Sequence, residues 1–271
     1  MTAKIAILGG GNIGLSLAKG LISSQLYQPE DIIITRRRLH MIEHIATEGV
    51  EISQDNVMAT RAARIVFLTV KPQQAKEVLA EIASSLQPDK QILISLVTGL
   101  GIGQIKAIIG NGIPVFLAMP NTALALCESM TCISHREEQE KDTEVVTGLF
   151  DQLGKSLIIP EELMGASTVL AACGVAFALR FLRSISQGGI EIGFDAEIST
   201  LIAAQTLKGA ARMAQETGNH PEHEIDRVTT PMGITISGLN EMEHNGFSSA
   251  LIKGLLASYR KIESLNGRKP E

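Results

Sequence analysis

The sequence has no tryptophan and very few aromatic residues. Seven Phe and two Tyr make up 3% of the chain, whereas proteins that bind single-stranded nucleic acids stack the bases on aromatic side chains. Basic residues are also in short supply, because 24 Lys and Arg stand against 29 Asp and Glu and leave a net charge of −5. Such a chain lacks the positive field that attracts a phosphate backbone or an anionic membrane surface. We therefore expect neither a nucleic acid nor a membrane as its partner.

Cysteine is scarce, and the three present, Cys127, Cys132 and Cys173, form no CxxC pair. An odd, dispersed set of thiols is typical of a reducing compartment rather than of a secreted disulfide scaffold. The N-terminal apolar run, residues 5–8, is too short for the core of a signal peptide. These features predict a cytoplasmic protein.

Long hydrophobic runs and metal-ligand clusters are missing as well. One long stretch without a charge is residues 163–179, 17 residues interrupted by two glycines; since a membrane span needs about 20 apolar residues, we expect a helix buried within protein. His40 and His44 have the i, i+4 spacing of two metal ligands. No cluster of Cys, Asp or Glu supplies an obvious third ligand, so we expect no bound metal. Motifs of hydrolysis or phosphoryl transfer, such as GxSxG or a P-loop, are absent.

Short apolar runs alternate with segments of helical length over residues 1–160. The runs are residues 4–8, 31–35, 65–70, 91–95 and 114–118. Continuous apolar runs are typical of parallel strands that helices cover on both faces. This half is therefore predicted to be an α/β domain with a doubly wound, Rossmann-type parallel sheet.

Residues 161–271 have a different character. No proline occurs between 161 and 220, and Ala, Leu and Ile recur at helical spacing, which predicts an all-α domain. A helix expected near 201–213 carries small residues at 203, 204 and 209–211, which permit close approach of another helix. Because one short domain offers little cover for such faces, we expect a homodimer through these C-terminal helices. Assembly of dimers into a higher oligomer stays open.

A glycine-rich loop follows the first predicted strand. Gly9-Gly10-Gly11-Asn12-Ile13-Gly14 matches GxGxxG and leads directly into an amphipathic helix. In this motif the first glycine makes a tight turn, the second lets the backbone approach a pyrophosphate, and the third allows close packing of helix on strand. We expect Gly9, Gly11, Asn12, Ile13 and Gly14 to bind a dinucleotide at the positive end of that helix.

The second predicted strand ends in a basic turn, Thr35-Arg36-Arg37-Arg38. An NAD enzyme usually has Asp or Glu here to bind the ribose 2′-hydroxyl. Guanidinium groups and a hydroxyl instead suit a 2′-phosphate, and we expect Arg36 and Arg37 to have no acidic neighbour. Thr35, Arg36 and Arg37 are therefore predicted to bind NADPH, with NADH bound more weakly. A merely solvated basic turn is the alternative.

Two further turns follow predicted strands, Val70-Lys71-Pro72 and Met119-Pro120-Asn121-Thr122. Ligands of open α/β sheets bind at the carboxyl ends of the strands, so these turns are candidates for the nicotinamide half of the cofactor. Ordinary turn and capping chemistry explains the same residues equally well. The cofactor candidates here are Val70, Lys71, Pro72 and Met119, together with Asn56; Asn121 is a candidate for substrate binding.

Taken with a C-terminal segment, these motifs resemble the pyrroline-5-carboxylate reductase family over nearly the whole chain. The segment spans residues 205–239, preceded by Ala204, and is the specific part of the resemblance. With Ala204 it contains the runs AQTLKGA at 204–210, HP at 220–221 and VTTPMGIT at 228–235.

The resemblance implies reduction of 1-pyrroline-5-carboxylate to L-proline by hydride transfer from NADPH to a C=N bond. It also implies that main-chain N–H groups at Thr230, Met232, Gly233 and Ile234 bind the substrate carboxylate, and that Thr235, as the catalytic residue, faces the ring nitrogen. Met232 stands where the family usually has a glycine, and a positive φ there would cost a non-glycine residue about 1 kcal/mol or more.

Two other functions remain open on the sequence. One is another NADPH-dependent reductase of the imine or β-hydroxyacid type, which a substrate screen would separate. The other is a non-catalytic NADPH-binding sensor, which would bind the cofactor without turning over any cyclic imine.

Overall fold

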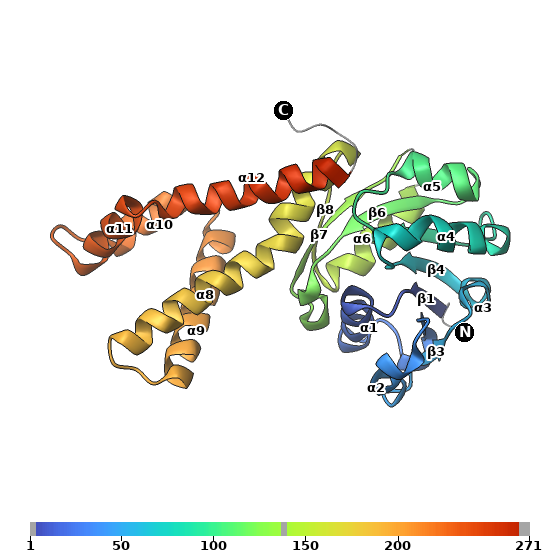
Figure 1. Ribbon diagram of the computed structural model, residues 1–271, viewed down its shortest axis with the longest axis horizontal. Coiled ribbons are helices and arrows are strands. Elements are labelled where there is room, and N and C mark those ends of the chain that lie inside the picture. Colours follow the sequence, from blue (N-terminus) through green and yellow to red (C-terminus); the bar gives the residue numbers. More distant parts are fainter. Residues whose placement is uncertain (1–3, 137–139, 266–271) are drawn as a thin grey trace. The chain divides into compact units, whose positions relative to one another are not determined.

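A computed structural model of the protein describes residues 4–136 and 140–265 (Figure 1). The chain forms two compact units. The first unit runs to Cys173 and includes the chain again from Tyr259, and the second comprises Gly174–Ser258.

The first unit is built on an eight-stranded sheet. Its strand order is β3-β2-β1-β4-β5-β6-β7-β8, and every neighbouring pair is parallel except β6 and β7, which are antiparallel. The strands are β1 (Lys4–Leu8), β2 (Ile32–Thr35), β3 (Glu51–Ser53), β4 (Ala63–Leu68), β5 (Ile92–Ser95), β6 (Val115–Met119), β7 (Ser129–Ser134) and β8 (Gly154–Ile158).

Helices cover both faces of this sheet (Figure 1) because its central strands are apolar on both sides. Along β1, Ile5 and Ile7 belong to one buried cluster, and Ala6 and Leu8 belong to the other. The first cluster includes side chains of α1 (Asn12–Ser23), α2 (Glu43–Ala46) and α6 (Glu140–Asp151). The second includes side chains of α3 (Asn56–Ala62), α4 (Pro72–Ile82) and α5 (Ile102–Ile109). The predicted doubly wound, largely parallel sheet is thus confirmed.

The five predicted strands correspond to β1, β2, β4, β5 and β6. The largest shift is in β4, which ends at Leu68, because Thr69 and Val70 begin the turn beside the glycine loop. Strands β3, β7 and β8 were not predicted. Their sequences EIS, SMTCIS and GKSLI mix polar and apolar residues, and β3 and β8 lie at the two edges of the sheet.

The second unit is helical throughout its regular structure. It contains α8 (Gly174–Glu191), α9 (Ala196–Thr217), α10 (Pro221–Val228), α11 (Ile234–His244) and the first part of α12 (Phe247–Leu265). Helices α8 and α9 approach closely, since a Cβ on Gly189 would lie 2.0 Å from the Ser199 hydroxyl oxygen. The Ser199 hydroxyl in turn donates to the Ser186 carbonyl at 2.7 Å. This confirms the predicted helical character of the C-terminal part, and α9 contains the helix expected near 201–213.

The predicted domains 1–160 and 161–271 differ from these units. Short helical turns at Glu161–Leu163 and Met164–Ser167 and a π-helix at Thr168–Cys173 belong to the first unit, where Met164 is buried in the sheet's second cluster. Compact packing and independent folding are different properties, so the predicted domain boundary stays a prediction.

The uncharged stretch 163–179 is helical, and only part of it is buried within this chain. Met164 and Val169 are buried, whereas Leu170 and Leu179 expose 72% and 57% of their surface. The helical span Glu161–Glu191 is long and apolar enough to cross a membrane by length and composition alone, and 22% of its most apolar window is buried in the chain. The exposed side chains of this stretch have few partners to pack against inside their own chain.

Gly20 on α1 provides a test of the packing in the first unit. A Cβ there would lie 2.3 Å from the Leu124 carbonyl oxygen, so we expect Gly20→Ala to lower the free energy of unfolding by about 1–3 kcal/mol. Gly148 on α6 has open space around it, and Gly148→Ala should raise stability by about 0.5–1 kcal/mol. Denaturant unfolding of both variants measures the difference, and equal stabilities would contradict the packing described.

Candidate active site

The glycine loop joins β1 to α1 at the point where the strand order reverses. Gly9 has a φ of +121°, and a Cβ on it would lie 2.9 Å from the backbone of Thr69 and Val70. A Cβ on Gly14 would lie 2.3 Å from the Gly9 carbonyl oxygen, whereas one on Gly11 would meet nothing within 4 Å. The chain itself thus requires glycine at 9 and 14, and the open side of Gly11 leaves room for a ligand to approach the backbone.

Backbone hydrogen bonds fix the path of this loop. The N–H groups of Gly9 and Gly10 donate to the Thr35 carbonyl at 3.2 and 2.8 Å, and the Gly11 N–H donates to the Gly9 carbonyl at 2.8 Å. Helix α1 then begins at Asn12 without a side-chain cap. The first N–H groups of a helix have no intrahelical partner, so those of Asn12 and Ile13 are available to an anion at the positive end of α1.

A cavity of about 520 Å³ opens beside this loop. It is lined by residues from the carboxyl ends of β1, β2 and β4, which are adjacent in the sheet. The structure brings together here eight of the predicted cofactor residues: Gly9, Gly11, Thr35, Arg36, Arg37, Asn56, Val70 and Lys71. Asn12, Ile13 and Gly14 stand next to it at the start of α1 but do not line it.

The arginines of the basic turn are held in different ways. Arg36 donates one guanidinium N–H to the Gly10 carbonyl and another to the Met41 sulfur, so it is fixed against the glycine loop. Arg37 forms an ion pair with Glu77 at 2.9 Å, with both side chains about two-thirds exposed. The expectation that neither arginine has an acidic neighbour is therefore wrong for Arg37. An exposed pair of this kind contributes about 0–1 kcal/mol, so a phosphate dianion can compete for Arg37.

Thr35 and Asn56 form the polar wall of the same cavity. The Thr35 hydroxyl donates to the Asn56 side-chain carbonyl at 2.6 Å, and the Asn56 amide donates to Glu81 at 2.9 Å. Asn56 stands there because it opens α3, whose N-terminus is capped by the Asp55 carboxylate. Asn56, which follows Thr35 by 21 positions in the sequence, thereby lies beside this last residue of β2.

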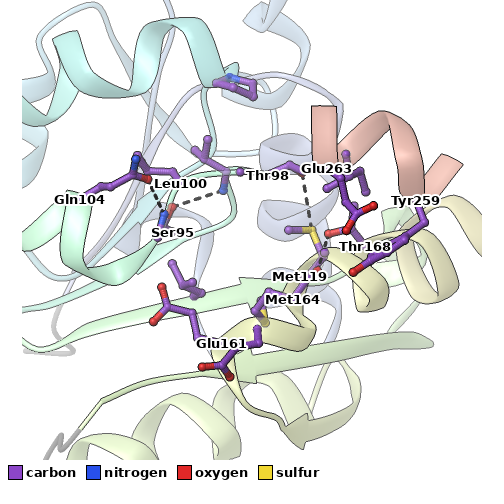
Figure 2. Close-up of a pocket in the computed structure, with 18 of the residues that line it drawn as sticks. Ser95, Thr98, Leu100, Gln104, Met119, Glu161, Met164, Thr168, Tyr259 and Glu263 are labelled. Atoms are coloured by element: carbon purple, nitrogen blue, oxygen red, sulfur yellow. Dashed lines mark hydrogen bonds between the residues drawn. The ribbon is translucent and has the colours of Figure 1, made fainter. Parts of the chain in front are cut away.

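A second cavity, of about 660 Å³, lies at the carboxyl ends of β5 and β6. Figure 2 shows Ser95 and Met119 from these strand ends facing the same space as Glu161 and Tyr259. Pro72 and Met119, predicted for the nicotinamide half of the cofactor, line this cavity rather than the first.

Glu161 shapes this second cavity although the sequence analysis did not single it out. One carboxylate oxygen accepts the Ile102 N–H at the start of α5 at 2.9 Å, and the other pairs with Arg136 at 2.6 Å. The loop after β5, which contributes Val97 and Thr98 to this cavity, is also absent from the residues predicted from the sequence. Its position after an apolar run is the same signal that singled out Lys71 and Asn121.

Asn121 lines neither of these two cavities. Its side-chain carbonyl accepts the Ala123 N–H at 2.9 Å, and its amide donates to the Ala171 carbonyl at 3.2 Å. The side chain is buried, with 8% of the residue exposed. In this structure Asn121 therefore holds the turn after β6, and its contact with substrate stays a prediction.

In the second unit, the predicted carboxylate loop is a tight turn. The Gly233 N–H donates to the Thr230 carbonyl at 2.9 Å, and Met232, which directly follows Pro231 as the third residue of the turn, has a φ of +59°. Proline at the second position and a positive φ at the third are features of a type II turn, which favours glycine at that third position. Met232 therefore carries the backbone strain expected of a non-glycine residue at this position.

The turn presents main-chain N–H groups rather than charged side chains. Gly233 precedes α11 with no side-chain cap, and a Cβ on it would lie 2.5 Å from the Thr230 hydroxyl oxygen. The N–H groups of Ile234 and Thr235 open the helix, where they have no intrahelical partner and meet the positive end of the helix dipole. The turn and the start of α11 thus form a main-chain site suited to a carboxylate.

Neither the Cys132 thiol nor the arrangement of metal-ligating side chains favours thiol or metal chemistry in the described part of the chain. Burial raises the pKa of the Cys132 thiol, and a hydrogen bond with Ser167 opposes that shift only in part. A thiol held protonated is a weak nucleophile. Among residues 4–136 and 140–265, no group of three or more His, Cys, Asp or Glu is placed to hold a metal ion.

Two family models match the sequence. The model described as pyrroline-5-carboxylate reductase dimerisation matches residues 161–265. The model described as NADP oxidoreductase, coenzyme F420-dependent, matches residues 4–99, which contain the glycine loop, the basic turn and the turn at 70–72.

The chain is similar to two pyrroline-5-carboxylate reductases of Dictyostelium discoideum. It is 43% identical to reductase 2 over 274 residues, which cover 95% of this chain and 91% of that protein. It is also 43% identical to reductase 1 over 279 residues, which cover 98% of this chain and 50% of that protein. The chain therefore spans only half the length of reductase 1.

The fold is similar to that of a solved pyrroline carboxylate reductase from Plasmodium falciparum with NADP bound. The TM-score is 0.89 at 25% identity, and the similarity covers 98% of each chain. The likeness in sequence and in structure thus points to a single family.

Arg36 offers a test of cofactor selection. Because its guanidinium is fixed at the cavity beside the glycine loop, we expect Arg36→Ala to reduce the preference for NADPH over NADH by about 1–2 kcal/mol, or about tenfold. Fluorescence titration with each cofactor measures the preference, and the affinity for NADH serves as the control because NADH lacks the 2′-phosphate. An unchanged ratio would show that Arg36 does not contribute to recognition of the 2′-phosphate.

Proposed function

The chain belongs to the pyrroline-5-carboxylate reductase family, and from this premise we propose that it reduces 1-pyrroline-5-carboxylate to L-proline with NADPH. The observation that carries the proposal is the presence in one chain of two complementary sites. One is a glycine loop flanked by a fixed arginine, and the other is a main-chain carboxylate site at the start of α11.

The first unit would hold the cofactor in three places. The start of α1 would bind the diphosphate, the basic turn and Asn56 would bind the 2′-phosphate, and the turns after β4 and β6 would face the nicotinamide half. When bound, NADPH supplies the hydride that adds to the C=N carbon. The proposed residues are Gly9, Gly11, Asn12, Ile13, Gly14, Thr35, Arg36, Arg37, Asn56, Val70, Lys71, Pro72 and Met119.

The loop at 230–235 would hold the substrate. The main chain of Thr230, Met232, Gly233 and Ile234 would bind the carboxylate, and the Thr235 hydroxyl would accept a hydrogen bond from the ring nitrogen. A protonated iminium already carries the proton that the product nitrogen keeps, so no side chain in the loop has to act as an acid. The protein's contribution is then to orient the ring, which lowers the barrier without covalent catalysis.

We also propose that two copies associate through the C-terminal helices. Helices α8 and α9 and the connection between them leave several large apolar side chains about half exposed or more, among them Leu179, Ile192 and Leu201. Many exposed apolar side chains on one pair of helices favour an interface there. The match of residues 161–265 to a dimerisation model supports the same assignment. We infer a cytoplasmic location from the scarcity of cysteine.

The direct test is oxidation of NADPH in the presence of pyrroline-5-carboxylate. If Thr235 orients the ring nitrogen, Thr235→Ala should lower kcat by about ten- to a thousandfold, while Thr235→Ser retains most of it. The affinity for NADPH should stay the same in both variants. A kcat of Thr235→Ala equal to that of the wild type would show that this loop has no part in the mechanism. Cofactor binding without turnover would instead favour a sensor or a reductase of another imine.

Met232 gives a second test, because its φ of +59° strains the turn that presents the carboxylate site. Met232→Gly should relieve a strain of about 1 kcal/mol and so raise the fraction of free molecules that hold the turn, which should lower KM for pyrroline-5-carboxylate severalfold. Since the carboxylate is bound alike in the ground and transition states, kcat should change little. Steady-state kinetics of the variant decides the point, and an unchanged KM would show that the turn is equally competent with methionine.

A further inference from the structure

Thr69 is a buried polar residue beside the candidate cofactor site of the first unit. It follows directly after β4 and lines the cavity beside the glycine loop, with 7% of the residue exposed. Its N–H donates to the Leu8 carbonyl at 2.9 Å, which extends the pairing of β4 with β1 by one residue. The side chain is thereby held against the point where β1 gives way to the loop.

The Thr69 hydroxyl contacts the loop itself. Its oxygen lies 2.7 Å from the Gly9 carbonyl oxygen and 3.1 Å from the Leu8 carbonyl oxygen, so its single proton is donated chiefly to Gly9. The Gly9 carbonyl also accepts the Gly11 N–H at 2.8 Å. Both lone pairs of this carbonyl are therefore used, one by the loop and one by the neighbouring strand end.

These bonds hold the loop from two sides. The carbonyl of Thr35, at the end of β2, accepts the N–H groups of Gly9 and Gly10, and the hydroxyl of Thr69, at the end of β4, donates to the Gly9 carbonyl. Gly9 lies at a φ of +121°, a backbone region in which glycine has many alternatives. The orientation of the peptide after Gly9 decides where the first N–H groups of α1 point, so the Thr69 hydroxyl restricts a segment that would otherwise have to be ordered by the ligand.

We propose that Thr69 is a positioning residue of the cofactor site, whose hydroxyl fixes the Gly9 carbonyl and so orders the glycine loop before the cofactor diphosphate binds. The physical basis is preorganisation, since a loop that is already ordered loses less conformational entropy on binding. The proposal rests on the proposed function only in taking the glycine loop as the diphosphate site. It makes no use of the substrate loop.

The variants that test it are Thr69→Val and Thr69→Ser. Valine has nearly the shape of threonine but donates no hydrogen bond, whereas serine keeps the hydroxyl. Thr60 supplies a matched control. It is another buried threonine of the same unit, its hydroxyl has no hydrogen-bond partner in the described part of the chain, and it lines neither cavity.

Fluorescence titration with NADPH is the first measurement, and the absence of Trp removes the usual competing protein emission. Thr69→Val should weaken NADPH binding about three- to tenfold, and Thr69→Ser and Thr60→Val should stay within about twofold of the wild type. Adenosine 2′-monophosphate, which has no diphosphate, should bind Thr69→Val as it binds the wild type. In turnover, KM for NADPH should rise in Thr69→Val with kcat nearly unchanged.

Three results would overturn the proposal. They are wild-type affinity of Thr69→Val for NADPH, equal weakening by serine and valine, and a parallel loss of affinity for adenosine 2′-monophosphate, which would indicate a general structural defect. If Thr69→Val does not fold, the difference between Thr69→Ser and Thr69→Ala isolates the hydroxyl. Because binding is measured without pyrroline-5-carboxylate, a failure of the proposed reaction leaves this test intact.

Discussion

The first unit depends on how closely the glycine loop approaches the ends of β1, β2 and β4. No side chain fits at Gly9 or Gly14, because a Cβ would lie within 3 Å of backbone atoms at both positions. This close approach places the first turn of α1 where the strand order reverses, which is the point at which open α/β sheets bind their ligands. The basic turn and Lys71 reach the same cavity because β2 and β4 are the two neighbours of β1. The position of the candidate cofactor site is thus a consequence of strand order, and its chemistry is a consequence of which residues end each strand.

Much of this arrangement could be predicted from the sequence, because strands buried on both faces leave a plain signal. The limits of β1 agree with its apolar run residue for residue, and those of β2, β5 and β6 shift by one residue at most. Strands β3 and β8 escaped prediction because an edge strand has a neighbour on one side only and tolerates polar residues. The antiparallel β7 escaped for a related reason, since its sequence SMTCIS mixes polar and apolar positions.

The details of the site were harder to predict because they depend on contacts between distant residues. Glu77 lies 40 positions after Arg37, and Glu161 lies 59 positions after Ile102. Neither pairing has a local signal, since each follows from the way helices return to the sheet. The turn at Met232 is the opposite case. Pro231 before it and Gly233 after it are local turn signals, and the positive φ they favour is present. Sequence therefore predicts the backbone of a turn better than it predicts the partner of a surface charge.

The two candidate sites differ in how they tolerate substitution. At the basic turn, the proposed recognition of a phosphate would depend on side chains, so loss of one guanidinium would remove a charged hydrogen bond directly. At the start of α11, the proposed recognition of a carboxylate would depend on N–H groups that every residue except proline provides. The side chains of Met232 and Ile234 are almost fully exposed, so the main-chain site keeps its donors whatever these side chains are. What the substitution at 232 changes is the free energy of holding the turn. A main-chain site can thus change residues while keeping its ligand class, at a cost in strain rather than in lost contacts.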